Sequence, residues 1–136
     1  MTKELDEFVR HRAGYVCEYC RLPQDVHGWR FEIDHIIAEQ HGGKTESENL
    51  ALCCPRCNRQ KGPNIAGVDP EMRQVVKLFN PRLDFWKDHF EYQDLHILGR
   101  TPNGRATVVV LGMNDAIRLA VRAALADEGT LIKERK

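Results

Sequence analysis

Two Cys-x-x-Cys pairs constrain the fold of this chain more than any other feature of its sequence. The pairs are Cys17/Cys20 and Cys54/Cys57, within a chain of 136 residues. One pair alone is a weak signal, because the same motif occurs in redox proteins, but two pairs provide the four sulfur ligands of a tetrahedral zinc site. We therefore predict that one structural Zn²⁺ joins the pairs and closes the segment between them into a unit.

The fifth cysteine, Cys53, is the one left over, because Cys54 has the two-residue spacing to Cys57. Two other uses of the cysteines are alternatives. A thioredoxin-like redox motif would need a βαβ pattern around one pair, and neither pair has one. Disulfides are less compatible with a reducing cytosol than thiolate ligation is. Structural zinc is therefore the preferred interpretation.

The overall composition indicates one domain, or a small module with an extension. Hydrophobic residues make up 42% of the chain, which allows a modest core. The first residues lack the apolar run of a secretory signal, and the sequence has no run of about 18 apolar residues that could span a bilayer. We expect a cytoplasmic protein that does not enter a membrane and is either a monomer or a homodimer.

Charge is distributed unevenly along the chain, although the formal net charge is zero. A net charge of zero argues against a protein that coats nucleic acid by bulk electrostatics. Residues 31–50 nevertheless carry five acids and one lysine, whereas a short basic segment follows at Arg56, Arg59 and Lys61. These three side chains are candidates for phosphate contacts, and the alternative is an ordinary solvated helix face.

The first half of the chain is expected to fold as a helix followed by a β-loop-β-α unit. Thr2 can cap the first helix and Gly14 can end it. Pro55 is at a favoured first helical position, and Gly62-Pro63 stops the helix that begins there. The remaining segments follow from alternation and polarity, with a strand within 30–37, a polar loop over 39–49, a second strand over 50–53 and a helix over 55–61.

The second half is expected to form an accessory extension of helix, β-hairpin and helix, which makes the chain an α+β protein. Asp69-Pro70-Glu71 resembles a helix start, and Asn80-Pro81 would close that helix. Strands over 91–98 and 105–111 would be joined by a turn at 99–104, because Asn-Gly favours hairpins. Asn114 would cap a last helix, ended by Gly129, whose expected buried face is Ile117, Ala120, Val121, Ala124 and Leu125. We divide the chain at residue 66, giving a core of 1–66 and an extension of 67–136, and we expect the 133–136 tail to be disordered.

The segment between the cysteine pairs carries the residues best suited to bind a metal ion or to accept a proton. Asp34 is a hard carboxylate suited to Mg²⁺ or Mn²⁺, and His35 beside it is the side chain best able to take a proton near neutral pH. Asn58 can add an amide oxygen to the same metal. Neighbouring residues of a regular strand point to opposite faces, so we predict that the strand twists or ends at this position.

Taken together, these residues resemble the HNH endonucleases of the ββα-metal group. The resemblance covers about residues 14 to 63 and rests on Asp34-His35, Gly42-Gly43, Asn49-Leu50, Cys54-Pro-Arg-Cys57-Asn58 and Lys61-Gly62. It implies a ββα-metal core in which His35 is the general base, Asn49 holds the loop that orients this base, and Asn58 helps to bind the catalytic metal. The last of these positions is asparagine rather than histidine, so the chain looks like an H-N-N variant, and oxygen ligands favour Mg²⁺ or Mn²⁺.

The resemblance implies hydrolysis of DNA phosphodiester bonds with one divalent ion, held by Asp34 and Asn58, and with His35 as the base. An alternative from another class is a zinc-stabilised module without catalytic activity that binds nucleic acid or protein. A toxin or a phage packaging nuclease would share the chemistry but differ in its partners. The set of Asp34, His35 and Asn58 favours the nuclease, because a binding module does not need it.

Overall fold

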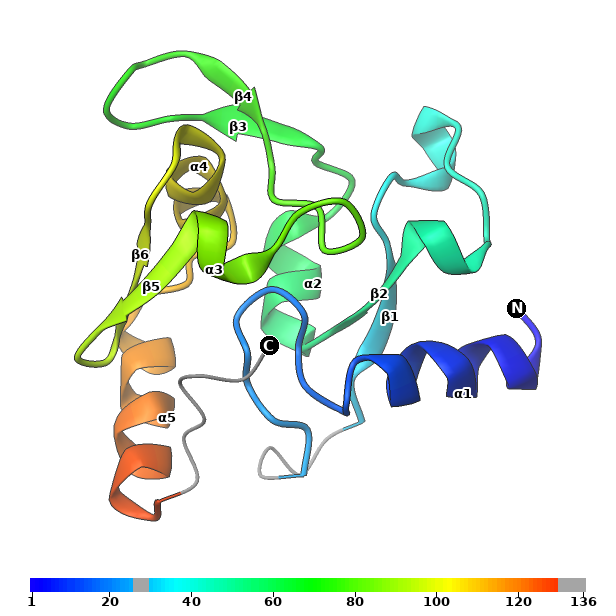
Figure 1. Cartoon of the computed structure of the whole chain (residues 1–136), viewed down its shortest axis with the longest axis horizontal. Coiled ribbons are helices and arrows are strands. Elements are labelled where there is room, and N and C mark those ends of the chain that lie inside the picture. Colours follow the sequence, from blue (N-terminus) through cyan, green and yellow to red (C-terminus); the bar gives the residue numbers. More distant parts are fainter. Residues whose placement is uncertain (26–29, 130–136) are drawn as a thin grey trace.

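The computed structural model describes residues 1–25 and 30–129, and it has an α+β fold (Figure 1). The α-helices are α1 Lys3–Arg12, α2 Pro55–Lys61, α3 Trp86–His89, α4 Pro102–Val110 and α5 Ala116–Asp127. The strands are β1 Glu32–His35, β2 Leu50–Cys53, β3 Ala66–Val68, β4 Val75–Lys77, β5 Phe90–Gln93 and β6 His96–Gly99. Two short 3₁₀ turns, Glu39–His41 and Ser47–Asn49, lie in the loop between β1 and β2. Within the described residues the strands pair as three antiparallel hairpins, β1-β2, β3-β4 and β5-β6.

The β1-β2-α2 unit forms as its sequence predicts. β1 and β2 are antiparallel, with Asp34 opposite Ala51 and His35 opposite Leu50. β1 ends at His35, which confirms the expected end of the strand at this position. α2 has the predicted bounds, with Pro55 in its first turn, and Gly62 follows it at φ +50°. β1 therefore ends at Asp34 and His35, the two residues predicted to bind a metal ion and to accept a proton.

The first helix is also confirmed. The Thr2 hydroxyl accepts a hydrogen bond of 3.1 Å from the Leu5 amide, which satisfies a free N–H group of the first turn. α1 contacts β1 and β2 (Figure 1), and Val9 on this helix is completely buried. The helix thus covers the hairpin that carries the candidate site.

The helix predicted from Asp69 was wrong, because this segment forms the β3-β4 hairpin. The Asp69 carboxylate accepts hydrogen bonds of 3.2 Å from the amides of Glu71 and Met72, and Arg73 adopts φ +58°. Asp-Pro initiates turns as readily as helices. Here the turn is stabilised by Arg105, whose Nε and Nη2 atoms donate to the two oxygens of Asp69, each at 2.8 Å.

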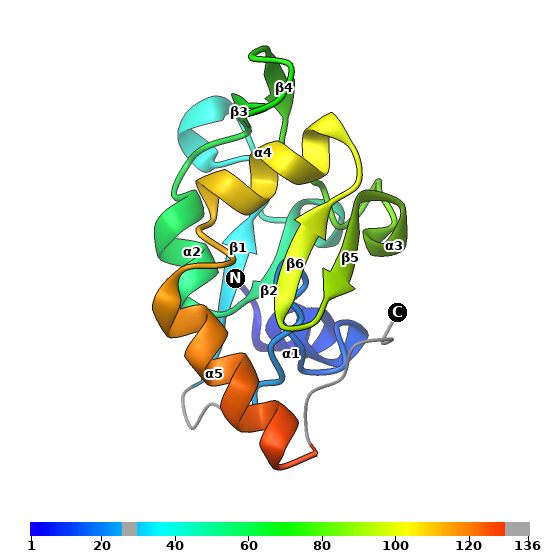
Figure 2. The same ribbon diagram turned by 90° about the vertical axis from the view of Figure 1, so that its left-hand side faces the viewer.

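The hairpin predicted around residues 99–104 was wrong in position, and the segment 105–111 is helical instead of extended. β5 and β6 meet at a tighter turn that includes Asp94 at φ +54°. Thr101 caps α4 by accepting from the Gly104 amide at 3.0 Å. A Cβ atom on Gly104 would lie 2.1 Å from the His89 carbonyl oxygen, so this glycine permits a close approach of α4 to α3. Packing against β6 (Figure 2) therefore overrides the strand preference of the three valines that end α4.

The last helix is present, but its cap and its buried face differ from the prediction. Asp115 caps α5 by accepting from the Arg118 amide at 2.9 Å, whereas Asn114 bonds to both backbone groups of Ile97. Arg118, Arg122 and Leu125 are buried, while Ile117 is 55% exposed. The prediction failed because hydrophobic spacing alone does not reveal guanidinium groups that find buried acceptors.

One hydrophobic core joins the two halves of the chain. It runs from the cysteines and Tyr19, through β2, to Phe79, Trp86 and Phe90. The Trp86 indole N–H donates to the Tyr19 carbonyl oxygen at 2.7 Å, which ties the second half to the first. β3 itself crosses the boundary that we drew after residue 66.

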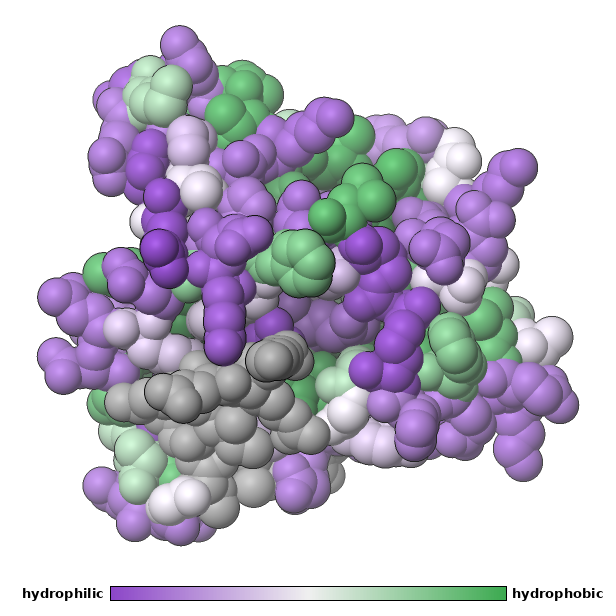
Figure 3. All heavy atoms as spheres, in the orientation of Figure 1, coloured by the Kyte–Doolittle hydropathy of each residue, from purple (hydrophilic) through white to green (hydrophobic). Residues whose placement is uncertain are grey.

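The surface of the molecule is mixed in polarity. The face drawn in Figure 3 is mainly hydrophilic with separate hydrophobic patches. Among the described residues, no helix is long and apolar enough to cross a membrane. The predicted disorder of the 133–136 tail falls outside the described residues.

Candidate active site and metal centre

The four cysteines of the two Cys-x-x-Cys pairs meet in one buried cluster. Cys17 and Cys20 lie in the loop after α1, Cys54 immediately precedes α2, and Cys57 lies within this helix. Their sulfur atoms all lie within 4.8 Å of one another, and those of Cys20 and Cys54 are 3.7 Å apart. Four thiols at such distances match the donor set of a structural Zn²⁺. Cys53 is also buried but does not belong to the cluster, and all five cysteines are free thiols.

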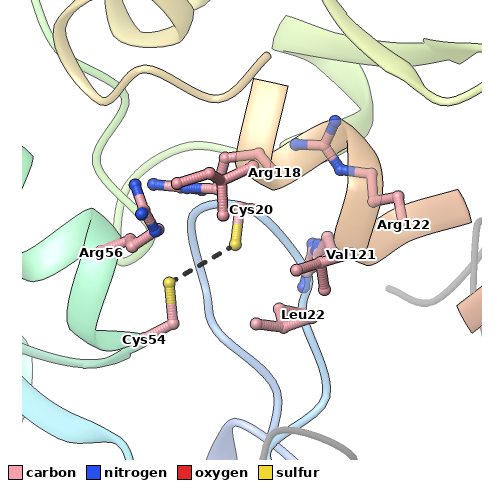
Figure 4. Close-up of a pocket in the computed structure, with 9 residues that line it drawn as sticks. Cys20, Leu22, Cys54, Arg56, Arg118, Val121 and Arg122 are labelled. Carbon is pink, nitrogen blue, oxygen red and sulfur yellow. Dashed lines mark hydrogen bonds between the residues drawn. The ribbon is translucent and has the colours of Figure 1, made fainter. Parts of the chain in front are cut away.

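An arginine from the last helix lies against this cluster. The Arg118 guanidinium donates from Nη2 to the Cys57 sulfur at 3.4 Å and to the Leu111 carbonyl oxygen at 3.0 Å. Burial lowers the pKa of Arg118. The neighbouring cysteine sulfurs raise this pKa by more than burial lowers it, so the net shift is upward. Figure 4 shows Arg118 beside the sulfurs of Cys20 and Cys54. Sequence reasoning missed this contact, because nothing in the local pattern of α5 indicates a buried cation.

Asn49 joins two parts of the loop between β1 and β2 through its side-chain amide. Its Oδ1 atom accepts from the Ile37 amide at 2.9 Å. Its Nδ2 atom donates to the carbonyl oxygens of Ile37 and Lys44, at 3.0 and 2.9 Å. One nearly buried side chain therefore joins the end of β1 to the middle of the loop.

Asp34 lies at the inner side of the candidate site and is 6% exposed. Its Oδ2 atom accepts from the Tyr19 hydroxyl at 2.9 Å and lies 3.1 Å from Lys61 Nζ. Burial raises the pKa of the Asp34 carboxyl above its ordinary value, while Lys61 and Tyr19 act in the opposite direction. Both of these contacts use Oδ2 rather than Oδ1.

The position of Lys61 contradicts its predicted role as a phosphate contact. Its side chain is 2% exposed, and Nζ also donates to the Ile36 carbonyl oxygen at 3.1 Å. The other two basic residues of this segment lie nearer to solvent. Arg59 is exposed, and Arg56 is partly exposed and lies 3.5 Å from Asp115. The basic segment is therefore divided between the interior and the surface.

His35 is partly exposed at the end of β1. Its Nε2 atom lies 2.8 Å from the Thr45 hydroxyl oxygen. This hydroxyl belongs to the loop between β1 and β2 that Asn49 joins to the end of the strand. The tautomer of the ring determines whether Nε2 or the hydroxyl donates the hydrogen bond. No sequence signal distinguished Thr45 from the other polar residues of the loop.

Asn58 reaches the site from α2 and lines one shallow hollow together with Asp34 and His35. Ile33, Ala38, Glu39, Gly62 and Pro63 complete the lining. The Asn58 Nδ2 atom donates to Glu32 Oε2 at 3.1 Å. The structure thus brings together the three predicted residues from β1 and α2. A carboxylate oxygen and an amide oxygen fit a hard cation such as Mg²⁺ or Mn²⁺.

Comparison with known proteins identifies this region. The sequence model of the HNH endonuclease family matches residues 17–64, which include the four clustered cysteines and the whole β1-β2-α2 unit. This segment therefore matches an HNH endonuclease domain in sequence. The chain is also similar to Septu protein PtuB of Bacillus thuringiensis, with 27% identity over 105 residues. That alignment covers 76% of this chain and 38% of the relative. No solved structure matches the chain.

Proposed function

We propose that this chain is a metal-dependent endonuclease that hydrolyses phosphodiester bonds of DNA. The observation that carries the proposal is the common hollow of Asp34, His35 and Asn58, which lie on two different elements. The match of residues 17–64 to the HNH endonuclease family supports it. Because the chain spans only part of Septu protein PtuB, the proposal concerns this domain and extends to no other part of that relative.

His35 is the general base in this proposal. A hydrogen bond from Nε2–H to Thr45 would fix the neutral tautomer in which Nδ1 carries a lone pair. Nδ1 can then accept a proton from a water molecule that attacks the scissile phosphorus. General-base assistance of this kind contributes about 10²- to 10⁴-fold to a rate.

Asp34 and Asn58 would hold the Mg²⁺ or Mn²⁺ ion through their Oδ1 atoms. The ion, when bound, supplies positive charge that stabilises the phosphate and the leaving 3′ oxygen. Tyr19 and Lys61 fix the orientation of the Asp34 carboxylate, because both contact its Oδ2 atom. Zn²⁺ bound by the four cysteines would have a structural role and would position α2, which carries Asn58.

The surface residues Arg59 and Arg56 are the remaining candidates for contacts with the DNA backbone. Both lie on α2, the helix that also carries Asn58.

We assign residues 67–136 the role of an accessory extension packed on the nuclease core, since one hydrophobic core includes both halves. A reducing cytoplasm would keep the zinc ligands as thiolates.

A plasmid cleavage assay tests the proposal. Zinc-loaded wild-type protein should cut plasmid DNA in the presence of Mg²⁺ or Mn²⁺, and His35→Ala should lose about 10²- to 10⁴-fold in rate. His41→Ala is the matched control, because His41 is an exposed histidine of the same loop region. Absence of metal-dependent cleavage by the wild type would instead indicate a zinc module without catalytic activity.

A further inference from the structure

Glu32 is an acidic residue at the edge of the candidate site for which the mechanism above gives no role. It is exposed at the start of β1 and lies two residues before Asp34, so the two side chains point to the same face of the strand. Its Oε2 atom accepts the hydrogen bond from Asn58 Nδ2 at 3.1 Å. Arg30, the cation nearest to it in the sequence, pairs with Asp6 at 3.0 Å instead.

The direction of this hydrogen bond determines which end of the Asn58 amide faces Glu32. An ionised carboxylate only accepts hydrogen bonds, so Glu32 selects the NH₂ group of the amide. The oxygen, Oδ1, is then turned away from Glu32. The terminal torsion of asparagine is broad and roughly two-fold, so an amide without such a partner would also present its NH₂ group to the site. An NH₂ group cannot bind a cation.

The charge of Glu32 also needs an explanation. A carboxylate beside a site for phosphate repels the substrate. A neutral or basic residue at the start of β1 would avoid this repulsion but could not select the NH₂ group in the same way. Glu32 at this position is therefore explained if the Asn58 oxygen has to face the cation, because only an acceptor selects the NH₂ group.

We propose that Glu32 is a positioning residue that turns the Asn58 amide so that Oδ1 is presented to the divalent cation. The proposal rests on the proposed function, because the cation is the one assigned to Asp34 and Asn58. Glu32 acts through Asn58 and does not bind the ion itself. Groups that orient metal ligands typically change metal affinity by about 10- to 100-fold when they are removed.

A double-mutant cycle in Mn²⁺ affinity tests this role without any measurement of cleavage. Zinc-loaded protein is titrated with Mn²⁺ by calorimetry, as wild type and as Glu32→Ala. We expect Glu32→Ala to weaken binding about 10-fold or more. The same substitution is then made in an Asn58→Asp background. The carboxylate of that background offers an oxygen in either orientation, so Glu32→Ala should leave the affinity there unchanged or increase it by removing a like charge.

An equal loss of affinity in both backgrounds would overturn the proposal, because it would mean that Glu32 is itself a ligand. Unchanged affinity in both backgrounds would overturn it too. Side-chain amide resonances give an independent readout, with the Asn58 pair assigned by its loss in Asn58→Asp. Glu32→Ala should shift this pair in the absence of Mn²⁺, whereas Glu48→Gln, an exposed acid in another part of the domain, should not.

The outcomes separate this proposal from the proposed nuclease function. If Mn²⁺ binds and the cycle behaves as expected but no DNA is cut, the positioning role holds and the nuclease proposal fails. If DNA is cut while the cycle shows an equal loss or no loss, the nuclease proposal holds and the positioning role fails.

Discussion

Lys61 Nζ lies 3.1 Å from Asp34 Oδ2, and the two side chains are 2% and 6% exposed. The same ammonium group contacts the carbonyl oxygens of His35 and Ile36, at 3.4 and 3.1 Å, where β1 ends. Lys61 is the last residue of α2, and the zinc-ligand candidate Cys57 lies in the same helix. α2 therefore connects the cysteine cluster at its start to the candidate catalytic strand at its end.

Lys61→Met should destabilise the protein strongly, because it leaves the Asp34 carboxylate buried without its cation. Removing one partner of a buried ion pair costs about 3–5 kcal/mol. Urea unfolding of zinc-loaded protein measures this loss. Arg59→Met is the matched control on the exposed side of the same helix, and its effect should stay within about 0.5 kcal/mol. Equal stability of the two variants would show that the buried pair contributes nothing.

Removal of zinc should unfold the HNH domain. Structural zinc in small domains contributes apparent binding free energies of about 10–16 kcal/mol, so a strong chelator should abolish the circular dichroism of the native state. Elemental analysis should find one zinc per chain in the wild type and less in Cys57→Ser. Cys53→Ser should keep its zinc, since Cys53 lies outside the cluster. Loss of zinc from Cys53→Ser would contradict the assignment of the ligands.

Asn49→Ala should loosen the loop that carries Thr45. The substitution removes three hydrogen bonds, to both backbone groups of Ile37 and to the Lys44 carbonyl oxygen, and we expect a loss of about 1–3 kcal/mol. Hydrogen exchange should become faster over residues 37–46 and stay unchanged in α4. Ser47→Ala in the same loop is the control. Exchange as slow as in the wild type would argue against Asn49 as the holder of this loop.

Arg118→Met should speed the release of zinc to a chelator. Its guanidinium donates to the Cys57 sulfur and to the Leu111 carbonyl oxygen, so the variant loses both bonds near the cluster. Loss of a group that contacts a metal ligand typically weakens metal binding by about 10- to 100-fold. Ile117→Ala, on the exposed side of α5, should leave the release rate unchanged. A rate for Arg118→Met equal to that of this control would show that α5 does not support the cluster.

The part of the fold that the sequence predicted well is the part governed by local rules. Thr2 caps α1, and Pro55 and Gly62 delimit α2, because these residues act on the backbone within a few positions. The prediction for the second half of the chain was wrong where a local sequence signal was ambiguous. Asp69 starts a turn because Arg105, distant in the sequence, binds its carboxylate.

The candidate site shows the same division. The residue types and their spacing were enough to select the cysteine cluster and the set of Asp34, His35 and Asn58, since metal and proton chemistry depends on side-chain type. The sequence could not show that Glu32 contacts Asn58 or that Thr45 contacts His35. Those contacts join residues whose proximity is created only when the hairpin and α2 pack together.

By itself, the sequence determined which groups are available for chemistry and which short segments start and end helices. Only the tertiary structure decided which atoms of each group make contacts, that Lys61 lies inside and that α5 buries Arg118 and Arg122 together with Leu125. The physical reason is burial. A polar group leaves water only where distant parts of the chain supply its hydrogen-bond partners, and those partners are defined by packing.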